Sequence, residues 1–67
     1  MTYGENIKKL REQHGMSQAD VAKDIGVSAA IVCGWERGNK QMSIANLICL
    51  ADLFLVSTDE ILGRRIS

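Results

Sequence analysis

Few side chains in this chain are of the types that carry out catalysis or hold a metal ion. It has one histidine, His14, and two cysteines, Cys33 and Cys49. The cysteines are too few for a disulfide framework, and they lack the paired spacing of a zinc site. The chain also has no glycine-rich phosphate loop and no pair of carboxylates suited to acid–base catalysis. We therefore expect no enzyme activity, no cofactor and no metal. We interpret both cysteines as reduced, small apolar residues, with a redox role for Cys33 left open.

The charged side chains are numerous, but they cancel. Eight basic and eight acidic residues give a formal net charge of zero. A neutral chain has no overall field to attract nucleic acid, so any such binding must come from a local arrangement of charge. The 67 residues, 46% of them hydrophobic, suffice for one small domain spanning residues 1–67. Because no apolar run reaches about 18 residues and no signal-peptide pattern opens the chain, we expect a cytoplasmic protein without membrane attachment.

Hydroxyl side chains and glycines mark the predicted ends of the helices in this chain. Five helix-length stretches each follow a residue that can cap a helix N-terminus, namely Thr2, Ser17, Ser28, Ser43 and Ser57. Together with the glycines, these caps predict helices at about 3–14, 18–25, 29–37, 44–54 and 58–63. We find no alternating strand pattern, so the predicted fold is all-α with five helices. Apolar residues at helical spacing predict a core of Ile7, Leu10, Val21, Ala22, Ile25, Val32, Trp35, Leu47, Leu50, Ala51, Phe54, Val56, Ile61 and Leu62.

The stretch from about residue 18 to 37 predicts a helix-turn-helix. Two short helices flank the turn Gly26-Val27-Ser28, which is too brief for them to lie antiparallel. Gly26 supplies the positive φ that ends the first of the two helices. Ala22 must be small because the next helix crosses close over it. In this arrangement the second helix projects and can enter a major groove.

Three segments carry a resemblance to a known family. They read SQADVAKDIGVS, then WERGNKQMS, then LADLFLVSTDEILGR, in this order and spacing. The chain closely resembles the lambda-repressor/Cro-like family of helix-turn-helix regulators, also called the XRE type, over about residues 5–64. The resemblance implies a compact five-helix DNA-binding domain that acts in transcription, usually as a homodimer on a palindromic operator.

The resemblance also implies roles for individual residues. Gln18 matches a position that commonly contacts a backbone phosphate. Positions of the second helix that face the groove in the family correspond here to Ser28, Ala29, Ala30, Ile31, Cys33 and Gly34. Residues of the following loop that usually grip phosphate correspond to Arg37, Asn39 and Lys40. Arg11 and Glu36 match a pair that commonly forms a partly buried ion pair, which would leave only positive charge between residues 29 and 50.

The groove-facing positions depart from the family pattern. Ala29, Ala30, Ile31, Cys33 and Gly34 cannot make the bidentate contacts that discriminate guanine or adenine. Small apolar groups can still touch thymine methyls, and Gly34 would allow close approach of its backbone. We therefore expect weak direct readout, with specificity helped by DNA shape. The alternative is that this helix contacts a protein instead.

The fourth helix also departs from the pattern. Ala45, Ile48, Cys49 and Leu53 would form a second apolar stripe on a helix already buried on one side, and Leu55 stands where Asn or Gly usually ends the helix. An unusually enclosed helix or a partner would explain this stripe, and we favour a homodimer with its two recognition helices about 34 Å apart. The predicted function is a sequence-specific, repressor-like transcriptional regulator that binds operator DNA as this homodimer, with no small-molecule ligand. The alternative is a protein-interaction module that docks a partner through its third or fourth helix.

Overall fold

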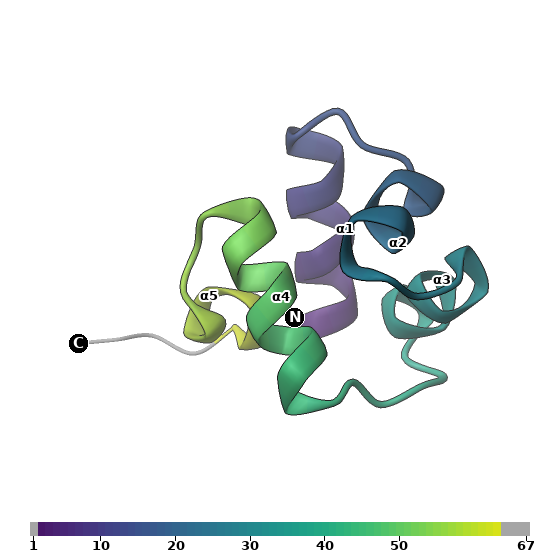
Figure 1. Cartoon of the computed structure of the whole chain (residues 1–67). Coiled ribbons are helices and arrows are strands. Elements are labelled where there is room, and N and C mark those ends of the chain that lie inside the picture. Colours follow the sequence, from purple (N-terminus) through teal and green to yellow (C-terminus); the bar gives the residue numbers. More distant parts are fainter. Residues whose placement is uncertain (1, 64–67) are drawn as a thin grey trace.

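A computed structural model of the chain describes residues 2–63 and contains five helices in that range (Figure 1). They are α1 (Tyr3–Gln13), α2 (Gln18–Ile25), α3 (Ala29–Arg37), α4 (Ile44–Phe54) and α5 (Thr58–Leu62). Every predicted helix is present, with ends that differ by at most one residue from the predicted ranges. The all-α fold class is confirmed.

Each helix begins at the hydroxyl residue that the sequence indicates. Thr2, Ser17, Ser28, Ser43 and Ser57 have extended backbones, and each side-chain oxygen accepts a hydrogen bond from the backbone N–H three residues later. At Thr2 and Ser17 the bond is reciprocal, because Glu5 and Asp20 accept from the backbone N–H of the cap. These bonds satisfy N–H groups that have no partner inside a helix.

The C-terminal end of α4 is unusual. Gly26, Gly38 and Gly63 end their helices in the left-handed region, which glycine adopts without steric cost. At the same position after α4 stands Leu55, with φ 57° and ψ 43°. Leu55 is 87% exposed, so packing of its side chain against residues 2–63 does little to compensate for the strain of this conformation.

The core lies where the five helices meet. Its buried apolar residues are Ile7, Val21, Ala22, Val32, Trp35, Leu50, Ala51, Phe54 and Ile61, all of them predicted. Of the other predicted core residues, Leu10, Ile25, Leu47 and Val56 are partly buried against this cluster. Leu62 does not belong to the core, because it is 40% exposed. Ile61 takes the inward position of the short α5, so its neighbour in sequence turns outward.

Helix α1 lies between the two halves of the molecule. Figure 1 shows α2 and α3 on one side of it and α4 and α5 on the other, and α1 contacts both α3 and α5. Gly4 allows the close approach of α1 to α3, because a Cβ atom there would lie 2.4 Å from the Trp35 carbonyl oxygen. The position of α3 is therefore set by backbone contact with α1 as well as by its turn with α2.

Candidate nucleic-acid interface

The turn between α2 and α3 directs α3 outward. The backbone N–H groups of Gly26 and Val27 both donate to the Ala22 carbonyl oxygen at 2.9 Å, and Gly26 has a φ of 79°. Ser28 then caps α3 by accepting from the N–H of Ile31 at 3.2 Å. Val32 and Trp35 anchor the inner face of α3 in the core. This is the geometry of a helix-turn-helix.

The outer face of α3 offers small side chains at its beginning. Ala29 and Ala30 are exposed, as is Ser28 before them. Ile31 and Cys33 are half-buried, and Ile31 packs against the core rather than standing free. A surface of this kind can follow the floor of a groove closely, but it brings few hydrogen-bonding groups from α3 itself.

An ion pair between Arg11 and Glu36 joins α1 to the C-terminal part of α3. Arg11 donates to Glu36 from Nε at 2.7 Å and from Nη2 at 3.1 Å, so the pair expected from the family resemblance is present. Arg11 also donates to the Met16 carbonyl oxygen at 2.9 Å. The side chains of Arg11 and Glu36 are only 12% and 4% exposed. Burial alone would raise the pKa of Glu36, but the hydrogen bonds from Arg11 and Gln18 outweigh it and lower that pKa.

Gln18 joins this pair from the first turn of α2. Its Nε2 donates to Glu36 Oε1 at 3.0 Å. A side-chain amide nitrogen carries two hydrogens, and this bond uses one of them. The amide is therefore held in a fixed orientation at the N-terminus of α2, where positive backbone charge collects.

A polar hollow surrounds these groups. Its lining combines side chains from α1, α2 and α3, namely Lys8, Arg11, Gln18, Cys33, Glu36 and Arg37. Three cations and one carboxylate give the hollow a net positive charge, although the whole chain is neutral. Lys8 was not among the predicted site residues. The i, i+4 spacing of Lys8 and Glu12 on α1 is typical of a solvated helix face and does not point to a binding site.

Arg37 ends α3, and the loop after it carries Asn39 and Lys40; all three residues are exposed. The backbone N–H groups of Asn39 and Lys40 donate to the Gly34 carbonyl oxygen at 2.8 and 3.3 Å, so the loop folds back onto α3. The side chain of Lys40 lies over Gly34, which is buried. The expectation that Gly34 offers its bare backbone to DNA is therefore wrong, because the lysine stem covers it. The Tyr3 hydroxyl, which was not among the predicted site residues, donates to the Lys40 carbonyl oxygen at 3.0 Å.

A separate apolar surface covers the outer side of α4. Of the residues predicted there, Ala45, Ile48, Cys49 and Leu55 are exposed. Leu53 instead packs half-buried against the core, so its predicted outward orientation is wrong. Ile44 was missed and is 77% exposed. The exposed apolar residues of α4 lie on neighbouring turns and form an apolar face, and the exposed Asp52, one turn after Ile48, lies between this face and Leu55.

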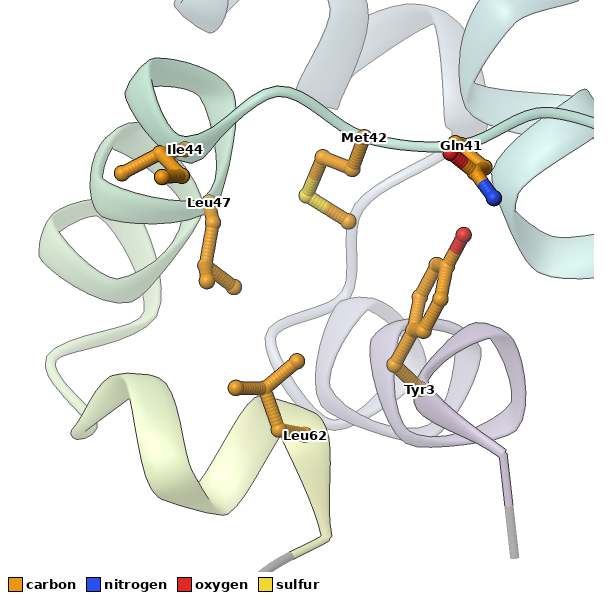
Figure 2. A pocket seen from close by; sticks show the side chains of 6 residues that line it. All are labelled: Tyr3, Gln41, Met42, Ile44, Leu47 and Leu62. Atoms are coloured by element: carbon orange, nitrogen blue, oxygen red, sulfur yellow. The ribbon is translucent and has the colours of Figure 1, made fainter.

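A shallow apolar hollow borders this face (Figure 2). Side chains from the N-terminus of α1, the loop before α4, α4 itself and α5 surround it, namely Tyr3, Gln41, Met42, Ile44, Leu47 and Leu62. Its volume of about 220 Å³ lies below the roughly 300–1,000 Å³ of typical small-molecule sites.

Within residues 2–63 no group of three or more potential metal-ligating side chains comes together. Among the same residues, no helix combines the length and apolar composition needed to cross a bilayer.

The geometry agrees with comparisons to known proteins. A helix-turn-helix family model matches residues 7–61, so the chain belongs to the helix-turn-helix family, and the lambda-repressor-like resemblance is confirmed. The chain is 36% identical over 59 residues to YazB, an uncharacterised regulator of the helix-turn-helix type from Bacillus subtilis (strain 168), covering 88% of this chain and 86% of that protein. YobD, a second such regulator from the same strain, is 33% identical over 61 residues. That match covers 91% of this chain and 54% of YobD, so the chain spans about half of that relative. Among solved structures, the P22 c2 repressor bound to a synthetic operator matches with a TM-score of 0.90 at 29% identity, over 97% of this chain and 98% of that one.

Proposed function

We propose that this chain is a sequence-specific, repressor-like transcriptional regulator that binds operator DNA in the cytoplasm through α3. The observation that carries the proposal is the joint placement of a projecting, small-residue helix and a positively charged hollow at its base. The similarity to a repressor bound to operator DNA supports it. A neutral protein can bind a polyanion when its local charge is arranged in this way.

In this proposal the protein makes two kinds of contact with the duplex, one with the phosphate backbone and one with the bases in the groove. Donors around α3 fix the position of the protein on the phosphate backbone, and we assign this role to Gln18, Ser28, Arg37, Asn39 and Lys40. Ala29, Ala30 and the accessible parts of Ile31 and Cys33 lie along the groove, where they contact thymine methyls. Because these contacts discriminate weakly, the shape and stiffness of the DNA contribute to specificity.

The active form in this proposal is a homodimer on a palindromic operator. The apolar face of α4, with Ile48 49% exposed and Ile44 and Leu55 more exposed still, is the surface we assign to the dimer. Burial in a dimer would also compensate for the strain at Leu55. A two-fold axis would place the two α3 helices about 34 Å apart, the spacing of successive major grooves.

The decisive experiment is a titration of the protein into a fluorescent duplex, either selected from random DNA or taken from the region upstream of its own gene. Affinity should fall steeply between 50 and 200 mM salt, by about a thousandfold if the dimer makes about six phosphate contacts. A scrambled duplex of equal length is the control and should bind more weakly at each salt concentration. Binding that is undetectable, or that does not change with salt, would overturn the proposal.

The apolar face of α4 favours a second candidate. A helix-turn-helix scaffold could dock a different protein through this face, with no role for DNA. The same titration separates the two candidates, since only the regulator binds the duplex. Loss of binding in variants of α3, with binding preserved in the matched controls described below, would exclude the pure interaction module.

A further inference from the structure

Lys40 occupies the space that a side chain at position 34 would fill. A Cβ atom built on Gly34 would lie 2.7 Å from Cδ, 2.8 Å from Cγ and 3.3 Å from Cβ of Lys40. Real Cβ atoms essentially never approach another atom that closely, so the stem of the lysine and a side chain at position 34 exclude each other. Lysine stems commonly lie along apolar surface while the ammonium group stays in solvent, and Lys40 is exposed overall.

The backbone of Lys40 is held from two sides. Its N–H donates to the Gly34 carbonyl oxygen of α3 at 3.3 Å, and its carbonyl oxygen accepts from the Tyr3 hydroxyl of α1 at 3.0 Å. The neighbouring Asn39 N–H donates to the same Gly34 oxygen at 2.8 Å. A loop residue anchored to two helices in this way keeps its side chain near α3, where a free loop would let it sample many positions.

We propose that Lys40 serves as the side chain of position 34 of the recognition helix, with Gly34 and Tyr3 as its positioning residues. The inference rests on the proposed function and deepens it. Gly34 lies one turn beyond Ala30 on α3, so the lysine stem extends the exposed stripe that begins there. A long cation delivered from the loop then compensates for the lack of donors on α3.

The chemistry that Lys40 recognises is a hydrogen-bond acceptor on the duplex. Its ammonium group has three donors and no acceptor. The major-groove edge of guanine offers two acceptors, N7 and O6, and the flanking phosphates offer oxygens. Ala29 and Ala30 bring no side-chain donor, so one correctly placed lysine would change the preference of the whole helix.

Two substitutions test the placement directly. Lys40→Met keeps most of the stem and removes the charge. Gly34→Ala adds the Cβ that the stem excludes, at a helical position where alanine is well tolerated. Its two closest contacts would be with Cδ and Cγ of a flexible side chain, which can rotate away. Each single variant should lower affinity about tenfold, the scale of one specific contact. The double variant should be no weaker than Lys40→Met alone, because both changes remove the same contact.

Arg37→Met provides the matched control. It removes a neighbouring charge, whereas the three atoms nearest to a Cβ at position 34 all belong to Lys40, so the loss caused by Gly34→Ala should be undiminished in that background. Tyr3→Phe removes one hydroxyl and should weaken binding of the wild-type chain but not of Lys40→Met. If Gly34→Ala costs the same with and without the Lys40 ammonium group, the inference is overturned while the proposed function survives.

Further measurements identify the acceptor and separate the two proposals. A guanine acceptor predicts that replacing one operator guanine with 7-deazaguanine weakens the wild-type chain but not Lys40→Met. A phosphate acceptor predicts that Lys40→Met weakens binding to all sequences alike and reduces the salt slope by about one. In the DNA-free protein, NMR should detect proximity between the Gly34 α-protons and the Lys40 methylenes, and its absence would overturn the placement. If the wild-type chain binds no duplex, the proposed function fails and the role of Lys40 fails with it.

Discussion

At the scale of single residues, Glu36 ties α3 to the rest of the molecule. Its carboxylate accepts two hydrogen bonds from Arg11 of α1 and one from Gln18 of α2. Because its side chain is 4% exposed, these bonds are poorly screened by solvent. The orientation of the recognition helix therefore depends on one partly buried charge as well as on apolar packing.

This arrangement predicts a pH dependence of stability. The folded-state pKa of Glu36 lies below its ordinary value of 4.5, so the ion pair stabilises the fold above that value and is lost as pH falls through the lower, folded pKa. Asp20, whose bonds with Ser17 lower its pKa, acts in the same direction. The free energy of unfolding should be level near neutral pH and decline below about pH 5, as measured by urea denaturation from pH 7 to pH 3.

Glu36→Gln is the matched variant for this measurement. It should lose about 2 kcal/mol of stability at neutral pH, because the partly buried Arg11 loses its hydrogen bonds to a charged partner. Its stability should also decline less steeply in acid than that of the wild-type chain. An identical pH slope in the two proteins would show that Glu36 is not the titrating group.

Arg37, the last residue of α3, is the cation whose removal should show the electrostatic part of DNA binding. Arg37→Ala should weaken binding to specific and scrambled duplexes alike and reduce the slope of log affinity against log salt by about one, because one phosphate contact is lost. The measurement is fluorescence anisotropy at several salt concentrations. Lys23→Ala removes an exposed cation in the last turn of α2, at the end away from Gln18, and should leave the slope unchanged. Full affinity in Arg37→Ala would remove this residue from the site.

At the scale of elements, α3 and α4 expose different surfaces. The exposed positions at the start of α3 carry serine and alanine, which leave a backbone surface that can lie close to another molecule. The exposed positions of α4 include two bulky isoleucine side chains, Ile44 and Ile48, and Leu55 follows in a strained conformation. Small residues suit a groove of fixed width, whereas bulky apolar residues suit a partner that removes them from water.

A charge on α3 tests which molecule that helix faces. Ala30→Glu should abolish detectable binding to the duplex, because a carboxylate would be placed against the phosphates. Ala30 is exposed, so circular dichroism and the melting temperature should stay close to those of the wild-type chain. Ala30→Gln, of nearly the same size but neutral, should keep measurable binding. Equal affinities of these two variants would show that α3 does not approach DNA.

At the scale of the whole molecule, the apolar face of α4 predicts self-association. Cys49→Lys should shift the mass measured by light scattering from dimer to monomer, because a charge would be buried at the centre of the interface. Cys49→Ser, which keeps the size, should stay dimeric under reducing conditions. A mass that is the same in wild type and Cys49→Lys would remove α4 from the interface. Monomers should also bind an operator half-site more weakly than dimers bind the full palindrome.

The sequence predicted the helices well because their ends depend on local chemistry. Each start has a hydroxyl cap, and three of the five helices end at a glycine in the left-handed conformation, signals that act over three or four residues. The contacts between distant segments were not predictable in this way. Tyr3 and Lys40 are 37 residues apart, and the cover over Gly34 exists only because the loop turns back onto α3. Lys8 was missed for the same reason, since its place in the polar hollow depends on α2 and α3 packing against α1.

The tight contact at Gly4 would affect the phenotype that a genetic screen assigns to substitutions at this position. Alanine there would place its methyl group 2.4 Å from one carbonyl oxygen of α3 and 2.7 Å from the next, both of them backbone atoms that cannot rotate away. Gly4→Ala would act as a wedge between two helices, and colonies carrying it should score as null mutants beside those altered in α3. The purified variant would distinguish the two causes, because its melting temperature should fall well below that of Ala30→Glu. Position 4 would then affect binding through the fold, because its substitution would separate α1 from α3.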